Sequence, residues 1–418
     1  MFSPTTIEKQ YAQAAADSLR VLVVGAGIAG STAAQLLRRD GRHPVLIERG
    51  DQDSSAGYML ALMPMVDVVL DDLGARDRYR AASTPLRRYA VHGHTGRKLR
   101  EDSMSAILAR FGDYRGIARG ELIDVLSGGG CPVSFGATVS ALTERTDGVE
   151  VSLRTPHGTH TLHFDLVIIA DGMHSQTREL VLAPQAAKVV DTGWGGWVVW
   201  AASDNPAADA DLGEEWWGAG LFAALYPVKG EVGVFVGGPR ADTAAGPAAF
   251  VARIRRQVKE VSPRLQRALN AVLDDPEPYY WSLTDCRAPT WTTGRTVLLG
   301  DAAAGFLPTA GIGAGMAMES AWMLCRSLRQ ADRTSAGLAD LLRGYERLQR
   351  PRVEAAQDNS RRLASLMFRR SRLLAVAREV AMRFVSVEQA LGPIQRLLQQ
   401  QPDPEELFSA TGEGLRAP

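Results

Sequence analysis

The stretch Val21-Leu22-Val23-Val24-Gly25-Ala26-Gly27-Ile28-Ala29-Gly30 decides the fold of this 418-residue chain. An apolar run that ends in Gly-x-Gly-x-x-Gly is typical of a buried strand followed by a helix in a dinucleotide-binding βαβ unit. Gly25 allows a tight turn, Gly27 lets backbone amides approach a pyrophosphate, and Gly30 lets a helix at 31–39 pack closely on the strand. Ile28 and Ala29 belong to the same turn and are candidate cofactor-binding residues, and the N-terminus of the following helix faces the phosphates.

The next predicted strand, 44–47, ends at Glu48 and Arg49. An acid at this place can accept hydrogen bonds from a ribose diol, which favours FAD or NAD over NADP. A chance glycine pattern in an ordinary βαβ turn is the alternative for this unit taken alone.

Two later segments repeat the pattern of an apolar strand that ends in a glycine turn. Asp171-Gly172 follows the strand 166–170, and Gly300-Asp301 follows 297–299. Because open α/β sheets bind ligands at the carboxyl ends of their strands, the three turns together predict one dinucleotide site.

These motifs resemble those of the class A flavin-dependent monooxygenases of the para-hydroxybenzoate hydroxylase fold. The resemblance covers about residues 20–365 and is carried by the first turn and by the segments 57–60, 73–74, 116–122, 171–178 and 300–315. It implies an α/β fold: a Rossmann-like FAD-binding domain interleaved with a substrate domain built on an antiparallel β-sheet, plus C-terminal helices.

The resemblance also implies roles for single residues. Arg119 lies where the family places an arginine near the FAD phosphates. Asp171, Gly172 and Arg178 belong to the family's combined FAD and nicotinamide motif, and Asp301 is placed to accept a hydrogen bond from the ribityl chain. Gly311, Gly313 and Ala314 open a predicted helix, 314–330, whose N-terminus would face the pyrimidine end of the flavin, where the reduced ring carries negative charge.

The activity that the resemblance implies is oxygen insertion. NADPH or NADH reduces FAD, O2 forms a flavin C4a-hydroperoxide, and one oxygen atom passes to an aromatic or polyketide-like small molecule in secondary metabolism. Hydroxylation, epoxidation and Baeyer-Villiger insertion stay open. A flavin-dependent halogenase and an FAD-dependent reductase or dehydrogenase of the same fold are the alternatives, although the Trp194-Gly195-Gly196-Trp197 segment lacks the spacing of the halogenase motif.

Several positions depart from the family pattern, among them Ser320 where members commonly have Asp, and three of them bear on the flavin face. Ala304 stands where members commonly have His, and Ile312 and Gly315 stand where they commonly have Gln and Asn. Losing these polar side chains predicts a drier flavin face, which would protect the hydroperoxide.

The predicted domain organisation is discontinuous. FAD-binding parts are expected at 20–84, 106–182 and 291–332, substrate-domain parts at 85–105 and 183–290, and a helical region at 333–418, with a helix broken at Pro351.

Candidate catalytic residues on the substrate side are His92, Tyr226, Arg287 and Pro308. His92 and His94 alternate along one strand, where they could deprotonate a phenol or simply lie exposed in a hairpin. Five tryptophans could form a cage for a flat substrate or pack in the core of the sheet: Trp194, Trp197, Trp200, Trp216 and Trp217.

Composition excludes several classes of partner. With 47 basic and 47 acidic residues, no net charge attracts nucleic acid or an anionic membrane. Cys131, Cys286 and Cys325 are far apart and lack metal-ligand spacing, so neither a metal site nor a disulfide is expected. No leader or membrane-length apolar run is evident, so the prediction is a cytoplasmic monomer or homodimer that binds a small aromatic or polycyclic molecule and O2.

Overall fold

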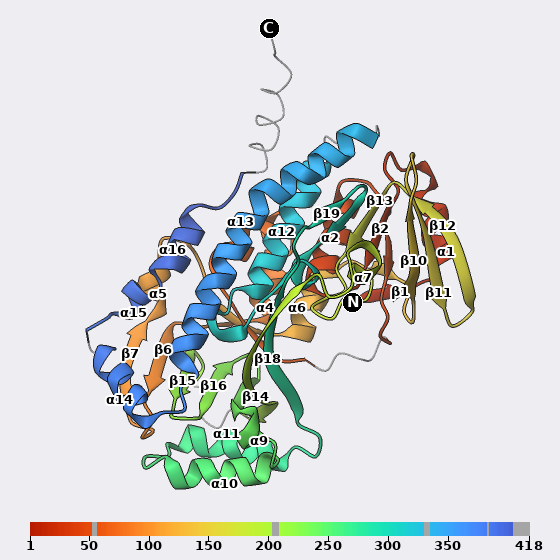
Figure 1. The fold of residues 1–418 in the computed structure, drawn as a ribbon. Coiled ribbons are helices and arrows are strands. Elements are labelled where there is room, and N and C mark those ends of the chain that lie inside the picture. Colours follow the sequence, from red (N-terminus) through yellow and green to blue (C-terminus); the bar gives the residue numbers. More distant parts are fainter. Residues whose placement is uncertain (52–56, 203–208, 330–334, 383, 404–418) are drawn as a thin grey trace.

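The computed structural model describes residues 1–51, 57–202, 209–329, 335–382 and 384–403. Figure 1 shows two sheet-based parts side by side, with the long helix α13 (Ser335–Met367) running diagonally across them. The predicted helix end at Gln330 and the last part of the predicted region 333–418 lie outside the described residues.

A five-stranded sheet holds the glycine turns. Its order is β19 (Thr292–Thr293), β20 (Thr296–Leu298), β13 (Leu166–Ile169), β2 (Val21–Val24) and β3 (Val45–Ile47). The four strands β20, β13, β2 and β3 are parallel. Every residue of β2 and β13 is buried, which is why these central strands read as continuous apolar runs rather than as alternating ones. Helices α2 (Ile28–Arg39) and α12 (Gly313–Leu328) pack against each other beside this sheet.

An eight-stranded sheet forms the second part. Its order is β21 (Ala304–Gly305), β18 (Tyr279–Arg287), β14 (Lys188–Ala202), β17 (Glu231–Pro239), β16 (Phe222–Pro227), β15 (Leu212–Trp217), β6 (Arg88–His92) and β7 (Lys98–Ser103). All neighbours are antiparallel except β15 and β6. Both predicted insertions, 85–105 and 183–290, contribute strands to this one sheet, while their boundaries as domains stay a prediction.

The two faces of the eight-stranded sheet are covered differently. Helices α10 (Pro247–Gln257) and α11 (Pro263–Asp274) cover one face, where Trp197 and Trp216 join their apolar side chains in a core. The other face is directed toward the five-stranded sheet and the C-terminal helices, and Phe222, Phe235 and Met367 belong to its apolar cluster.

The remaining elements complete these two parts. Three smaller sheets are also present. In the first, β11 (Val149–Thr155) lies between β10 (Thr138–Glu144) and β12 (Gly158–Phe164); in the second, β8 (Arg115–Ala118) lies between β4 (Met59–Leu62) and β5 (Thr84–Pro85); in the third, β1 (Phe2–Pro4) pairs with β9 (Cys131–Val133). The other helices are α1 (Ile7–Gln13), α3 (Asp67–Asp72), α4 (Arg76–Ala82), α5 (Met104–Leu108), α6 (Arg119–Leu126), α7 (Arg178–Val181), α9 (Arg240–Thr243), α14 (Arg372–Ala381), α15 (Val387–Ala390) and α16 (Gly392–Gln399).

The predicted helix break at Pro351 is wrong, because α13 continues through this residue. Proline removes one backbone donor from the helix interior, which usually kinks or ends a helix. Here the neighbouring side chains fasten this turn to α12: Gln349 donates to Glu319 at 3.2 Å, and Arg352 pairs with the same carboxylate at 2.7 Å. Tertiary contacts on both sides of the proline therefore outweigh its local preference.

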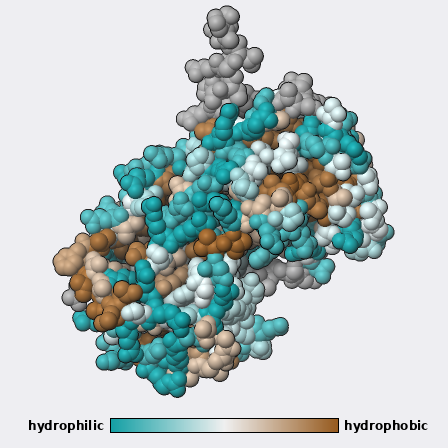
Figure 2. Space-filling view, in the orientation of Figure 1, coloured by the Kyte–Doolittle hydropathy of each residue, from teal (hydrophilic) through white to brown (hydrophobic). Residues whose placement is uncertain are grey.

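Helix α14 has an apolar outer face. Its exposed side chains include Leu373, Leu374, Val376 and Val380, and Figure 2 shows a brown apolar region over this helix. No helix within the described ranges is both long and apolar enough to span a membrane.

Candidate active site

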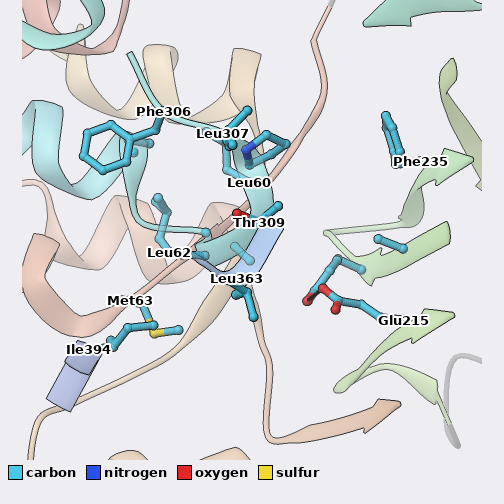
Figure 3. A pocket seen from close by; sticks show the side chains of 18 of the residues that line it. Leu60, Leu62, Met63, Glu215, Phe235, Phe306, Leu307, Thr309, Leu363 and Ile394 are labelled. Carbon is cyan, nitrogen blue, oxygen red and sulfur yellow. Dashed lines mark hydrogen bonds between the residues drawn. The ribbon is translucent and has the colours of Figure 1, made fainter. Parts of the chain in front are cut away.

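A cavity of about 580 Å³ lies between the glycine turns and one face of the eight-stranded sheet. Figure 3 shows side chains from both parts directed toward it, with Glu215 and Phe235 on the sheet and Leu307 and Thr309 opposite. The lining is mostly apolar. A largely apolar cavity with a few convergent polar groups is the usual form of a small-molecule site.

The first glycine turn has the geometry that its sequence predicts. Gly25 has φ of +96°, and a Cβ there would lie 2.6 Å from the carbonyl oxygen of Ala170. A Cβ on Gly30 would lie 1.9 Å from the carbonyl oxygen of Gly25, so close packing requires glycine. A Cβ on Gly27 would meet nothing within 4 Å, and Gly27, Ile28 and Ala29 line the cavity. The space above Gly27 is therefore open for a ligand.

Glu48 lies beside this turn at the end of β3. Its Oε2 accepts a hydrogen bond from the backbone N–H of Ala26 at 2.8 Å, and its Oε1 accepts one from Gly50 at 2.8 Å. Each carboxylate oxygen keeps a second acceptor site, which suits a ribose hydroxyl. The neighbouring Arg49 is exposed.

The turn after β13 brings Asp171 and Gly172 to the same edge. Gly172, with φ of +86°, lines the cavity. Asp171 Oδ2 accepts from the backbone N–H of Thr177 at 3.2 Å, while its buried Oδ1 has no partner in the protein. Arg178 is buried and donates to the carbonyl oxygens of Ala302 at 2.8 Å and Met173 at 3.0 Å. It is not among the cavity-lining residues, so it holds the two turns together.

Arg119 and Asp301 line the cavity near these turns. Removal from bulk water raises the pKa of the Asp301 carboxyl to about 6, and the charge of Arg119 opposes this shift. Gly300, in the same turn, has φ of +59°, and a Cβ there would lie 2.7 Å from the Ala29 Cβ.

The N-terminus of α12 forms the next wall. Gly311, Gly313 and Ala314 line the cavity, and no side chain caps the helix. The N-termini of α2 and α12 are thus two uncapped helix ends with free amide groups, which favour negative charge. Open space above Gly27, the unpartnered Asp171 Oδ1 and these amides fit the expected FAD.

The predicted drier flavin face is not explained by the three departures. Ala304, Ile312 and Gly315 are buried, and none of them lines the cavity. A Cβ on Gly315 would lie 2.6 Å from the sulfur of Met65, so this residue packs against the segment 64–66 instead. The three residues are therefore not the source of a drier flavin face, because helical residues 313, 314 and 317 face the cavity and residue 315 does not.

The four candidate catalytic residues lie in two different places. Tyr226 and Pro308 line the cavity. His92 lies on the opposite face of the sheet, where its ring stacks on Trp216 and its nitrogens contact the Gly96 carbonyl oxygen at 3.1 Å and Glu214 at 3.0 Å.

Arg287 also lies away from the cavity lining, because it fastens β18 to α13. Its guanidinium donates to Gln357 and to Asp358, each at 2.6 Å. Neither His92 nor Arg287 is placed to touch a molecule in the cavity, so neither has a catalytic role in the function proposed below.

Four of the five candidate tryptophans are not among the cavity-lining residues, and only Trp217 is. Trp197 and Trp216 pack in the core on the far face, and Trp194 stacks on Phe368 at 4.8 Å. The half-buried Trp200 is not part of the lining either. The alternative of core packing therefore holds for most of the set.

Sequence reasoning missed a polar group at the centre of the sheet face. Glu215 accepts hydrogen bonds from the hydroxyls of Tyr89 at 2.6 Å and Tyr226 at 2.8 Å and from the Trp217 indole N–H at 2.7 Å. All four residues line the cavity. The acidic pair at 214–215 inside an otherwise apolar strand was the available signal.

The C-terminal helices were also missed as walls of the cavity. Residues of α13 to α16 line it, among them Leu363, Arg378, Val387 and Ile394. No local pattern in the sequence predicts which part of the molecule these helices pack against.

Comparison with known proteins agrees with this geometry. Residues 18–360 match the family model described as an FAD binding domain. The 3-amino-4-hydroxybenzoate 2-monooxygenase of Streptomyces cremeus is 32% identical over 371 residues, which cover 83% of this chain and 87% of that protein. The 6-hydroxynicotinate 3-monooxygenase of Pseudomonas fluorescens is 28% identical over 351 residues, covering 80% and 88%.

A solved structure supports the same assignment. Klebsiella pneumoniae HpxO, complexed with FAD and uric acid, superposes with a TM-score of 0.80 at 26% identity, covering 92% of this chain and 97% of that one. The predicted fold class and the FAD cofactor are confirmed. On this evidence the chain belongs to the FAD-binding-domain family and is a class A FAD-dependent monooxygenase.

Proposed function

We propose that this enzyme uses NADPH or NADH to insert one oxygen atom of O2 into an aromatic or polycyclic small molecule. The observation that carries the proposal is one continuous cavity lined both by the glycine turns and by the aromatic face of the eight-stranded sheet. A substrate held on that face would lie directly against the cofactor, with no solvent layer between the two molecules. A cytoplasmic location, a role in secondary metabolism, and a monomer or homodimer stay predictions.

Several residues of this chain would hold the FAD. The open space above Gly27 and the N-terminus of α2 suit the pyrophosphate, and Glu48 suits the adenosine ribose. Arg119 and Asp301 line the part of the cavity between this turn and α12, whose N-terminal amides suit a reduced, anionic ring. The redox chemistry that activates O2 is supplied by the bound FAD.

The remaining lining residues exclude water and orient the substrate. Phe222, Phe235 and Leu363 form apolar walls on two sides of the cavity. An apolar enclosure strengthens the few polar contacts inside it and suppresses hydrolytic side reactions. Tyr226, which donates to Glu215, is the candidate catalytic residue that both lines the cavity and has a polar partner there.

The test is oxygen-dependent oxidation of NADPH and NADH by the FAD-loaded enzyme with a panel of aromatic and polycyclic compounds. We expect one class of compounds to gain a single oxygen atom that derives from ¹⁸O2, with little peroxide released. Ala381→Trp should narrow the cavity from α14 and lower turnover of bulky compounds, while FAD content is unchanged. The matched control is Ala377→Trp, because Ala377 is an exposed alanine one turn away on the same helix and does not line the cavity.

The same experiment separates the two alternatives. A halogenase of this fold relies on a reactive lysine, and among the described residues no lysine lines the cavity. A product that gains halogen, or one that is oxidised or reduced without gaining oxygen, would replace the proposal by the halogenase or the reductase.

A further inference from the structure

Glu215 is a buried acid that faces the substrate part of the cavity. Only 7% of the surface of this residue is exposed to solvent, and Figure 3 shows its carboxylate directed into the cavity. Its three partners, the Tyr89 and Tyr226 hydroxyls and the Trp217 indole, are neutral donors. Within the described part of the chain, this buried carboxylate therefore has hydrogen-bond donors around it but no ion-pair partner.

The other buried acids of the described residues have cationic partners. Glu214 pairs with Arg264 at 2.7 Å, Asp285 with Arg361 at 2.7 Å, and Glu319 with Arg352 at 2.7 Å. Buried charges are normally paired, because an unpaired charge in a low-dielectric interior is costly. Glu215 departs from this rule, although it is the neighbour of Glu214 in the same strand.

The donors around Glu215 fix how it can interact. The Trp217 indole N–H can only donate, and burial, together with the nearby Glu215 charge, raises the pKa of Tyr89 and Tyr226 well above their usual range. These hydroxyls therefore keep their protons and donate. Burial raises the pKa of the Glu215 carboxyl, while the three donors act in the opposite direction.

Acceptor capacity remains on one oxygen of this carboxylate. Oε2 accepts from Tyr89 and Trp217, while Oε1 accepts only from Tyr226. Since each carboxylate oxygen has about two acceptor sites, Oε1 keeps one for a ligand.

The cavity-lining arginines on this side donate to other groups, although the buried Nε of Arg378 has no hydrogen-bond partner among the described residues. Arg100 is held by Asp102 at 2.5 Å and donates to the Val385 carbonyl oxygen at 2.7 Å. Arg378 donates to the carbonyl oxygens of Leu366 at 3.0 Å and of Trp217, and its guanidinium lies 5.6 Å from the Trp217 ring centre. Neither guanidinium forms an ion pair with Glu215.

We propose that the missing cation is a protonated amino group of the substrate, which pairs with Oε1 of Glu215 in the cavity. The inference rests on the proposed function and deepens it, because it names the substrate class of the same cavity: an aromatic or polycyclic amine rather than an aromatic acid. Glu215 is thereby a specificity-determining residue.

The test is binding to the FAD-loaded enzyme, measured by isothermal titration calorimetry at pH 7.5 with three matched probes. Tryptamine carries an ammonium group, indole-3-ethanol a neutral hydroxyl and indole-3-acetate a carboxylate on the same ring system. A charge-assisted hydrogen bond in an apolar site predicts that tryptamine binds at least about 10-fold more tightly than indole-3-acetate, with indole-3-ethanol between them.

The variant Glu215→Gln keeps the size of the side chain and removes its charge, so it should abolish the preference for tryptamine over indole-3-ethanol. Glu214→Gln is the matched control on the opposite face and should keep the preference. Equal or tighter binding of indole-3-acetate, absence of binding by all three probes, or a preference that survives Glu215→Gln would each overturn the proposal. The wild-type order alone decides it if the variant does not fold. Because no turnover is involved, this outcome is independent of whether the oxygen-insertion assay succeeds.

Discussion

Two glycines of the first turn should respond oppositely to the same substitution. In Gly30→Ala the new Cβ would lie 1.9 Å from the Gly25 carbonyl oxygen, so strand and helix would have to separate by about 1 Å to reach a 3.0 Å contact. Overpacking of this kind costs about 1–3 kcal/mol, and only at the bottom of this range would it be balanced by the roughly 1 kcal/mol that alanine gains over glycine in a helix. In Gly27→Ala the new Cβ meets no protein atom within 4 Å. We therefore expect Gly30→Ala to destabilise the FAD-free protein and Gly27→Ala to leave its stability within about 0.5 kcal/mol of wild type.

FAD binding separates the two variants further. The Cβ of Gly27→Ala projects into the space that the pyrophosphate needs, so FAD affinity should fall by at least about 10-fold, or about 1.4 kcal/mol, at unchanged stability. The assays are thermal unfolding of the FAD-free protein and calorimetric titration with FAD. Wild-type FAD affinity in Gly27→Ala would refute the placement of the pyrophosphate over this residue, and unchanged stability in Gly30→Ala would refute the packing argument.

The pKa of Asp301 is about 6 in the folded protein and 3.8 ordinarily, so between these pH values the folded state holds a proton that the unfolded state has lost. Asp301 should therefore make the FAD-free protein less stable as the pH rises from about 4 to above 6. The difference is at most about 3 kcal/mol, and Asp301→Asn should therefore unfold at a higher temperature than wild type at pH 7.5 but not at pH 4; equal shifts at both pH values would contradict this. Arg352→Met should lower the free energy of unfolding by about 3–5 kcal/mol in urea titration, because it leaves Glu319 buried without a cation. The control is Arg350→Met: the Arg350 side chain is half-exposed, so this change should lower the free energy of unfolding by less than about 1 kcal/mol. Gly315→Asn should lower the melting temperature by several degrees without raising peroxide release, because a Cβ there would lie 2.6 Å from a methionine sulfur. Increased peroxide release at an unchanged melting temperature would instead show that residue 315 faces the flavin.

The cofactor half of the site could be predicted because its chemistry lies in short continuous segments. A strand, a glycine turn and a helix N-terminus occupy about ten residues, and the backbone itself makes the ligand contacts. The need for glycine is local at both positions: Gly25 has a positive φ, and Gly30 lies too close to the Gly25 carbonyl oxygen for a side chain. Arg178 shows the limit of this reasoning, since a motif match cannot say that its guanidinium is used by two backbone carbonyls.

The substrate half could not be predicted in the same way, because it depends on which face of a strand a residue occupies. His92 and Tyr89 belong to one strand, yet only Tyr89 reaches the cavity. Side chains alternate between the two faces along a strand, so a strand assignment that is wrong by one residue places core side chains in the site and site side chains in the core. The sequence shows the alternation but not which side the flavin is on.

Glu214 and Glu215 show why this face matters more than residue type. The two acids are adjacent, equally buried and chemically identical, but one meets Arg264 and His92 under the helices of the far face while the other meets two tyrosines and an indole in the cavity. The first pair is complete within the folded chain, so its removal changes stability. The second is incomplete without a ligand, so its removal changes what the cavity accepts. Substitutions on α14 and α16, which close the same cavity from the other side, should likewise shift the range of substrates while the glycine turns continue to hold FAD.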